Sequence, residues 1–530
     1  YAAMFANWAR QQPQSPVHAN EQGVTGTGES SEHSVRRDAE APSRRRSRDE
    51  WARAVHQCFG ERKLAEGEAL AREALHTYPE DGFFWKALGA LQHAQGHTEE
   101  ALHAKRKAVR YLPSDAEAFC NLGHACQAVN RFEEAESVLQ RALALRPDYA
   151  EAHNNLAITY QKTNRLDDAI LHFREAIRLN PTQEGIYSNL LFTLNYHPDK
   201  GGEEIYEAYE EYDRRYGTGV HGVGWRGHGN SRELGRVLKV GYVSPDFRAH
   251  SCMYFLEPLL ANHDRRRVQV YAYAQLGKED AVSQRYKGYV QHWVPTLGMS
   301  DEALAQRIRE DGIDVLVDVA GHTAGNRLGV FARKPAPVSL SWLGYGYTTG
   351  LKAIDYLLTD EVCAPPGSEG LFAEAPWRLP GACYVYRAPP GVVPPVGELP
   401  ALGNGYITFG TLTRAIRIND HVIEAWSEIL RRVPGSRLVI DSSSYQDDSV
   451  KAALVQRFER CGVEAGRLAV GYHTPGWGVL QGLDIGLDCF PHNSGTTLFE
   501  SVYMGVPYVT LAGRPSVGRM GGTILAALGA

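Results

Sequence analysis

The chain has few cysteines and lacks long apolar segments. Its 530 residues include only 8 cysteines, and no two of them form a C-x-x-C pair. This pattern excludes a disulfide scaffold and a zinc ribbon and is typical of a reducing compartment, so we expect a cytoplasmic protein with no bound metal. No apolar run approaches the roughly 18 residues that a membrane-spanning helix needs.

Neither sign of charge dominates. The formal net charge is -6, and 22% of the residues are charged. We therefore expect no overall electrostatic attraction to nucleic acid or to anionic membranes. The length predicts three or four domains. Because the chain begins with Tyr1 and stops in an apolar run at Ala530, we expect both ends to be truncated. Nothing in the composition indicates an oligomeric state.

Residues 1–46 are rich in Gln, Ser, Gly and Pro and end in clustered arginines. Such a composition cannot bury a core, so we predict a disordered tail. Its arginines could contact RNA or acidic lipid, or they could simply be solvated.

Residues 47–200 repeat with a period of 34. Alanine and proline recur at the same place in every unit, at Ala74, Ala108, Ala142 and Ala176 and at Pro79, Pro113, Pro147 and Pro181. Small residues allow two helices to approach closely, and proline ends the second helix of each unit. The period and these columns predict tetratricopeptide (TPR) repeats, in four full units and a partial fifth. The first unit is the weakest, because Gly67 replaces the alanine of the other units.

An asparagine column lies within the repeats, at Asn121, Asn155 and Asn189. An amide both donates and accepts hydrogen bonds, so this column could bind the backbone of an extended peptide in the groove of the array. The alternative is that these side chains cap local turns.

After a linker at 201–234 the pattern changes to short β-branched runs alternating with amphipathic segments. We expect strands at 237–243, 268–274, 314–319, 338–343 and 356–358, and a second set at 406–410, 437–440, 467–471, 485–487 and 508–511. Alternating strands and helices predict parallel sheets covered by helices, here two Rossmann-like domains at 235–398 and 405–530. Ligands bind such sheets beyond the carboxyl ends of the strands.

Candidate chemical groups lie at those strand ends. His250 follows the first predicted strand, and Asp318 and His322 follow the third, four residues apart across a glycine. We expect Asp318 and His322 to share a cleft rim, where a histidine beside a carboxylate can act as a base or bind an anion. A structural role is the alternative for each histidine.

The second domain carries candidate phosphate ligands. Gly495, Thr496 and Thr497 precede a helix, where free backbone N–H groups favour an anion, although the same residues could be an ordinary N-cap. Glu500, one turn later, could accept hydrogen bonds from ribose hydroxyls. Arg414 and Arg417 follow another strand and could neutralise a diphosphate.

These segments together resemble the TPR-containing O-linked N-acetylglucosamine (O-GlcNAc) transferases, of the bacterial type. The matching segments are 241–250, 318–323, 335–338, 342–345, 347–350, 355–356, 493–500 and 504–507. The resemblance covers about residues 47–530. It implies a GT-B fold, UDP-GlcNAc as the donor substrate, no cofactor, and protein Ser/Thr hydroxyls as acceptors. It also implies inversion at the anomeric carbon without a metal.

The resemblance also assigns roles to individual residues. His250, Asp318 and His322 match residues near the acceptor and the donor, and Thr496 and Thr497 match the pair that binds the diphosphate. Three positions differ from the family pattern. Arg417 stands in place of a lysine, Gly495 in place of a histidine, and Glu500 in place of an aspartate. His473 is placed at the donor site, and the segment 474–477 after it lacks an expected lysine.

The predicted function is therefore transfer of N-acetylglucosamine from UDP-GlcNAc to protein hydroxyls, with Arg417 stabilising the departing diphosphate. His250, Asp318 and a donor phosphate oxygen are all candidates for the base. Two alternatives remain: another nucleotide sugar used on a surface or flagellar protein, and a non-catalytic TPR adaptor with a degraded transferase domain. A sugar-nucleotide epimerase would share the GT-B fold but would not need a peptide groove.

Overall fold

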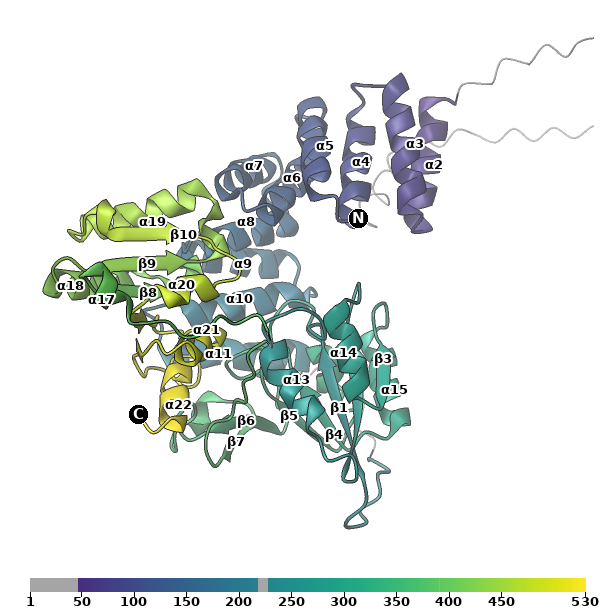
Figure 1. The fold of residues 1–530 in the computed structure, drawn as a ribbon. Coiled ribbons are helices and arrows are strands. Elements are labelled where there is room, and N and C mark those ends of the chain that lie inside the picture. The colour runs from purple at the N-terminus through teal and green to yellow at the C-terminus, as the bar shows by residue number, and fades with distance from the viewer. Residues whose placement is uncertain (1–45, 218–226, 390) are drawn as a thin grey trace, which may run out of the picture. The chain divides into compact units, whose positions relative to one another are not determined.

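The structure, a computed structural model, describes residues 46–217, 227–389 and 391–530 (Figure 1). It divides into two compact units, and the boundary between them falls after Pro147. Of the tail predicted at 1–46, only Arg46 lies within the described residues, as do parts of the predicted linker on either side of 218–226.

The first unit consists of paired antiparallel helices that keep the predicted period. They are α2 (Arg48–Gly60), α3 (Leu64–Thr77), α4 (Gly82–Ala94), α5 (Thr98–Tyr111), α6 (Ala116–Ala128) and α7 (Phe132–Leu145). The side chains of Asp81 and Asp115 accept hydrogen bonds from the first backbone N–H groups of α4 and α6, which is the usual way a helix start is stabilised. The turn between the two helices of each repeat is left-handed, with φ of 83° at Gly96 and 57° at Asn130. Glycine and asparagine are the residues that adopt this conformation most readily.

The weak first repeat has a packing explanation. A Cβ atom on Gly67 would lie 3.0 Å from Leu91 Cδ2 and 3.1 Å from Cys58 Cβ. In the next unit the position of Leu91 is occupied by the smaller Ala125, and the position of Gly67 by Ala101. Gly67 therefore compensates for the larger leucine.

The second unit begins with four more helices that continue the repeat pattern. They are α8 (Ala150–Lys162), α9 (Leu166–Leu179), α10 (Glu184–Tyr196) and α11 (Gly202–Tyr212), and a short π-helix, η1 (Asp213–Gly217), follows. The side-chain amide of Asn195 donates to the hydroxyls of Tyr209 and Tyr345, each at 2.8 Å. Arg514 donates to the backbone carbonyls of Asn195, His197 and Lys200. These buried contacts join α10 and the segment after it to the α/β part of the unit.

The α/β part contains two parallel sheets. The first has the order β3-β2-β1-β4-β5-β6-β7 and the second β10-β9-β8-β11-β12. The first comprises β1 (Leu238–Ser244), β2 (Val268–Ala274), β3 (His292–Pro295), β4 (Val315–Asp318), β5 (Val338–Ser341), β6 (Tyr356–Asp360) and β7 (Ala375–Leu379). The second comprises β8 (Thr408–Thr411), β9 (Arg437–Asp441), β10 (Leu468–Gly471), β11 (Ile485–Leu487) and β12 (Tyr508–Val509).

Helices connect these strands. In the first sheet they are α13 (Met253–Ala261), α14 (Ala281–Tyr289), α15 (Asp301–Asp311) and α16 (Leu328–Ala332). In the second they are α18 (Asp420–Arg432), α19 (Asp448–Arg460), α20 (Trp477–Gln481), α21 (Thr496–Tyr503) and α22 (Met520–Ala527), with α17 (Pro400–Asn404) preceding β8. The predicted fold class, a TPR array followed by two Rossmann-like sheets of the GT-B type, is confirmed.

Two strands were missed by the sequence analysis. Both β3 and β7 are edge strands: β3 ends in a proline, and β7 has no fully buried residue, so neither carries a clear strand pattern. Asp318 therefore ends the fourth strand, not the third. This correction places it beside β1, because β1 pairs with both β2 and β4.

Each sheet has a point where the direction of strand connection reverses. It lies between β1 and β4 in the first sheet and between β8 and β11 in the second. Loops diverge at such a point, and ligands of doubly wound sheets bind there. The loops after β1, β4, β8 and β11 carry most of the predicted site residues.

Candidate functional site

His250 lies in the loop between β1 and α13. Its Nδ1 atom is 3.5 Å from Oδ2 of the buried Asp246, and the backbone N–H of Cys252 points to the same nitrogen at 3.4 Å. Burial lowers the pKa of His250, opposed by Asp246 and aided by Arg248 and Arg414. The ring is thus neutral near pH 7. Because the Cys252 N–H donates to Nδ1, the neutral ring carries its proton on Nε2 in this arrangement. Accepting a proton at Nε2 needs the other tautomer, in which Nδ1–H faces the Asp246 carboxylate.

Asp318 is buried at the end of β4 and organises the loop that follows. Its carboxylate accepts hydrogen bonds from the Ser341 hydroxyl at 2.8 Å and from the backbone N–H groups of Gly321 and Ala320 at 2.9 and 3.2 Å. Burial raises its pKa to about 6 in spite of these donors. The carboxylate is therefore occupied by its own loop.

The structure differs from the expectation that Asp318 and His322 share a cleft rim. His322 is 2% exposed, and its Nδ1 and Nε2 atoms lie 2.9 Å from the Ser188 hydroxyl and 2.8 Å from the Thr349 carbonyl. Burial lowers its pKa to about 4. Gly321 turns the chain with a φ of 52°, and His322 then points into the contact between α10 and the first sheet. With both nitrogens engaged, His322 has a structural position.

The loop after β8 supplies two cations. Arg414 is exposed, whereas Arg417 is half-buried and its guanidinium carbon lies 5.6 Å from the centre of the Tyr196 ring. The Nε atom of Arg417 is buried, and no hydrogen-bond partner for it exists among the described residues. Tyr196 raises the pKa of Arg414, but the protein atoms around its guanidinium and the like charge of Arg417 outweigh this effect, so the pKa is lowered overall. The two arginines thus form a positively charged group with unused hydrogen-bonding capacity.

The loop after β11 is held close to the loop after β8. The buried carboxylate of Asp488 accepts from the backbone N–H of Ser494 at 2.8 Å and from the Thr510 hydroxyl at 2.7 Å. The hydroxyls of Ser494 and Thr413 are 3.3 Å apart. The start of α21 and the arginine loop are therefore neighbours.

The start of α21 has no side-chain cap. The N-cap residue is Gly495, which has no side chain to accept from the first N–H groups. Thr496 and Thr497 are partly exposed, and their hydroxyls have no hydrogen-bond partner in the described part of the chain. An uncapped helix start with two free hydroxyls favours binding of an anion.

Glu500 and His473 complete the predicted donor residues. Burial raises the pKa of Glu500 to about 7, and its charge acts on Tyr254 and Tyr386. Phe499 beside it packs on Phe255 of α13, with ring centres 5.3 Å apart. The helices that follow the two reversal points are thus in contact. His473 lies after β10, where its Nδ1 atom is 2.5 Å from Asp441 Oδ2.

The asparagine column behaves differently in the two units. Asn121 lies half-buried on α6 of the first unit. In the second unit Asn189 Nδ2 donates to Asn154 Oδ1 at 3.1 Å, and Asn154 Nδ2 lies 3.4 Å from Asn155 Oδ1. Asn154, which the sequence analysis did not single out, thus links the two predicted residues. Their role in peptide binding stays a prediction.

Sequence reasoning missed several residues that border the arginines. The ring of His492 stacks on Tyr196 with centres 4.2 Å apart and planes 4° from parallel. Burial and the charges of Arg417, Arg414 and Arg514 lower the pKa of His492 well below its usual value, so the ring is neutral. The polar residues at 492–494 indicate a functional loop in the sequence. The contact of His492 with Tyr196 could not be predicted, because the two residues are far apart in the chain.

Two groups of side chains in the described residues have the spacing of metal ligands. One is Asp246, His250 and Cys252, and the other is Asp360, Cys363 and Cys383. Burial raises the pKa of Cys252 to about 12, and burial together with Cys363 raises that of Cys383. Protonated thiols are poor ligands. The expectation of a site without metal stays a prediction.

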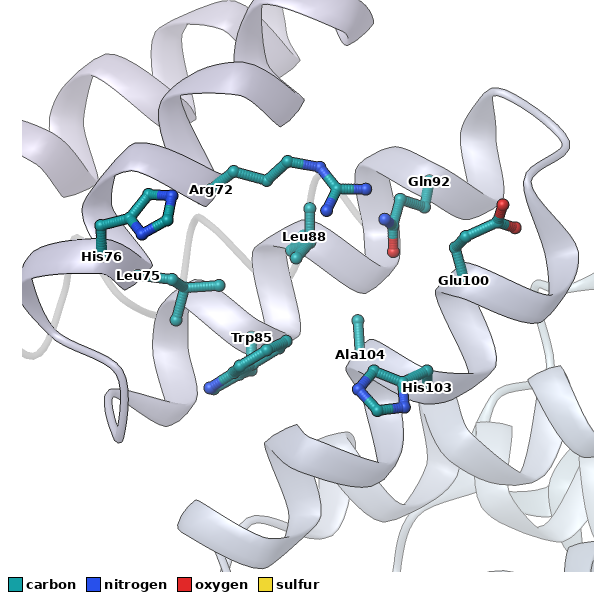
Figure 2. Close-up of a pocket in the computed structure, with 9 residues that line it drawn as sticks. All are labelled: Arg72, Leu75, His76, Trp85, Leu88, Gln92, Glu100, His103 and Ala104. Carbon is teal, nitrogen blue, oxygen red and sulfur yellow. The ribbon is translucent and has the colours of Figure 1, made fainter.

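A hollow of about 440 Å³ lies in the first unit, between α3, α4 and α5 (Figure 2). Trp85, Leu75, Leu88 and Ala104 make its apolar lining, and the indole N–H of Trp85 donates to the Pro79 carbonyl at 2.8 Å. None of the predicted site residues lines it.

Comparisons with known proteins agree with this arrangement. A model of glycosyl transferase family 41 matches residues 220–385, and a tetratricopeptide repeat model matches residues 114–181. The chain is 35% identical over 347 residues to the probable UDP-N-acetylglucosamine–peptide N-acetylglucosaminyltransferase SPINDLY of Arabidopsis thaliana, covering 64% of this chain and 38% of the relative. It is 34% identical over 158 residues to the UDP-N-acetylglucosamine–peptide N-acetylglucosaminyltransferase of Caenorhabditis elegans, covering 29% of this chain and 14% of the relative.

A solved structure extends the likeness to most of the chain. An O-GlcNAc transferase mutant from Thermobaculum terrenum matches with a TM-score of 0.78 and 29% identity, over 87% of this chain and 86% of that one. The chain spans less than two fifths of the length of the SPINDLY relatives. In the described residues no helix has the length and apolarity needed to cross a membrane. The repeats, the paired parallel sheets and these matches show a chain that combines tetratricopeptide repeats with a glycosyltransferase family 41 region, an arrangement that resembles the O-GlcNAc transferases.

Proposed function

We propose that the chain transfers N-acetylglucosamine from UDP-GlcNAc to Ser or Thr hydroxyls of a protein acceptor, with inversion and without a metal ion. The observation that carries this proposal is that the loop with Arg414 and Arg417 lies beside the uncapped start of α21. Such a group suits the diphosphate of a nucleotide sugar. The activities for which the relatives are named support the sugar and the acceptor class.

The chemical problem is the charge that UDP gains as the bond to the sugar breaks. Arg417, the N–H groups at the start of α21 and the hydroxyls of Thr496 and Thr497 are placed to stabilise it. Preorganised donors of this kind contribute about 3 kcal/mol each, measured as the cost of removing one. The Nε of Arg417 is such a donor, because no acceptor contacts it within residues 46–217, 227–389 and 391–530.

His250 is the best protein candidate for the base. It is partly exposed, its ring is neutral, and Asp246 is placed to hold a proton on Nδ1 in the tautomer whose Nε2 accepts. Asp318 is buried and already accepts hydrogen bonds from three donor groups, so we assign it to orienting its loop. His322 has no free nitrogen. A donor phosphate oxygen stays the alternative to His250.

The acceptor would lie along the repeat helices, with Asn121, Asn155 and Asn189 as partners for its backbone. A second candidate is the same transfer from another nucleotide sugar. Gly495 favours it, because a Cβ atom there would meet only Met520 Cε at 3.7 Å and the space beside the nucleotide site is open. A base other than uracil could use this space.

The test is intact-mass analysis of candidate acceptors co-expressed with the chain, combined with purified enzyme and a panel of uridine and guanosine sugar nucleotides. An added N-acetylhexosamine supports the proposal, and a different sugar increment supports the second candidate. UDP binding with no increment from any donor would favour a non-catalytic adaptor.

Arg417→Ala is the matching variant, and Arg432→Ala, an exposed arginine on α18, is its control. We expect Arg417→Ala to lower turnover at least about 100-fold while the control keeps normal turnover. Near-normal turnover of Arg417→Ala with unchanged folding would remove the assigned role.

A further inference from the structure

We propose that Lys162, the last residue of repeat helix α8, is a ligand of the donor's diphosphate. The site would then be built from three parts of the second unit: the repeat helices, the loop after β8 and the start of α21. This inference rests on the proposed function only in naming the anion as part of a sugar donor. Whether or not a sugar is transferred, the expected ligand is a nucleoside diphosphate.

The end of α8 is fixed against the arginine loop. The side-chain amide of Asn164, two residues after Lys162, donates to the Ile418 carbonyl at 2.8 Å. Leu166 packs with Tyr196 and Ile416 in a buried cluster, and α8 contacts the short helix η3 (Ala415–Arg417). The position of Lys162 relative to Arg414 and Arg417 is therefore set by packing on both sides.

The charge at this place is unbalanced. Lys162 is exposed, and no hydrogen bond or ion pair of its side chain exists within the described residues. The protein atoms around the amine of Lys162 and the positive charge of Arg414 both lower the pKa of Lys162. The carboxylate that acts on Arg417, Asp488, already accepts from Ser494, Cys489 and Thr510. Cations gathered without a free carboxylate repel one another, and a dianionic ligand removes this repulsion.

The buried Nε of Arg417 is an independent sign of a missing ligand. A buried donor without an acceptor is unfavourable, and native proteins rarely leave one unless an unplaced group satisfies it. Among the described residues neither Arg417 Nε nor the amine of Lys162 has a partner, and α8, which ends in Lys162, contacts η3, which ends in Arg417. A diphosphate has enough acceptor oxygens for both.

The repeat columns show that this lysine is not part of the repeat pattern. The equivalent positions at the ends of α2, α4, α6 and α10 are occupied by Gly60, Ala94, Ala128 and Tyr196. Small residues thus occupy this column until the helices meet the transferase. There it carries a lysine beside Arg414 and then a tyrosine under Arg417. A lysine that only stabilised the helix C-terminus would not need this placement.

The test is calorimetric binding of UDP, GDP, pyrophosphate and uridine to the whole chain. The variants are Lys162→Met and Lys162→Arg, with Lys107→Met on α5 of the first unit as the matched control. We expect Lys162→Met to raise the UDP dissociation constant about tenfold and Lys162→Arg to restore most of the affinity, because the interaction is with charge. Uridine, which has no phosphate, should bind all variants equally, and Lys107→Met should behave as wild type. The thermal midpoints should be unchanged.

Unchanged UDP affinity in Lys162→Met would overturn the inference, as would an equal loss of uridine affinity, which would indicate a folding defect. So would a wild-type chain that binds neither diphosphate nucleotide nor pyrophosphate. If UDP binding depends on Lys162 but no sugar is transferred from any donor, this inference stands and the transferase proposal fails. The two can therefore be separated.

Discussion

Lys105 gives the sharpest stability prediction, because it is a charged residue in an apolar column. The repeat period aligns it with Ala71, Leu139 and Phe173, and all four are buried. Its Nζ atom has no hydrogen-bond partner among the described residues. A Cβ atom on Gly89 would lie 2.8 Å from Lys105 Cγ, just as one on Gly123 would lie 2.5 Å from Leu139 Cγ. Lysine and leucine thus fill the same space in successive repeats.

The size of the effect follows from the pKa. Burial lowers the pKa of Lys105 from 10.5 to about 8. At about 1.4 kcal/mol for each factor of ten, holding the charged amine in the folded state costs about 3 kcal/mol at pH 7. Lys105→Leu removes this cost and keeps the packing against Gly89. We therefore expect it to stabilise the first unit by about 1–4 kcal/mol.

Hydrogen exchange of the full chain, followed by mass spectrometry on peptides from α4 to α6, measures this directly. Slower exchange in Lys105→Leu is the expected result. The matched reverse change, Leu139→Lys, should speed exchange in α6 and α7, because it places a second unpaired amine in the same column. Global unfolding of the second unit does not affect this local readout.

The pH dependence provides the refutation. Below pH 8 both folded and unfolded Lys105 are protonated, so the advantage of Lys105→Leu is constant. Between pH 8 and 10.5 the unfolded chain holds the proton that the folded one has lost, so wild-type stability rises with pH and the difference shrinks. In the folded chain the neighbouring His93 and Cys126 have pKa values near 4 and 12, so neither titrates between pH 8 and 10.5. A Cys120→Ser background removes the other thiol that acts on Lys105. A difference that stays constant to pH 10.5, or a less stable Lys105→Leu, would refute the reasoning.

Two further predictions concern the site and its support. Glu500, with a pKa near 7, should accept from ribose hydroxyls more strongly when ionised, so wild-type affinity for a nucleotide sugar should rise from pH 6 to 8. Glu500→Gln should bind with no such dependence by calorimetry, and a persisting pH dependence would assign it to another group. Ser188→Ala should leave Nδ1 of His322 buried without a partner and destabilise the second unit by about 1–3 kcal/mol in denaturant unfolding. UDP affinity should not change, and a large loss would return His322 to the donor site.

Local patterns predicted the fold well, because both the 34-residue period and the strand–helix alternation can be recognised in short stretches of sequence. The edge strands β3 and β7 were missed since edges need no buried alternating pattern. The position of His322 depended on the backbone turn at Gly321, which spacing along the chain cannot give. The roles of Tyr196 and Lys162 depend on contacts such as that of Asn164 with Ile418, which are 254 residues apart. The candidate residues on the loops after β8 and β11 could be proposed from the sequence because they follow strands directly.

The boundary after Pro147 has a consequence for how proteins of this kind can diversify. Helices α8 to α11 belong to the same compact unit as both sheets, whereas the repeats before Asp148 form a unit of their own. Whole repeats could therefore be gained or lost ahead of Asp148 without disturbing the contacts of Asn164, Asn195 or Tyr196. The number of repeats ahead of Asp148 would then be free to vary while the proposed donor site stays intact. The last repeats would be inherited as part of the enzyme.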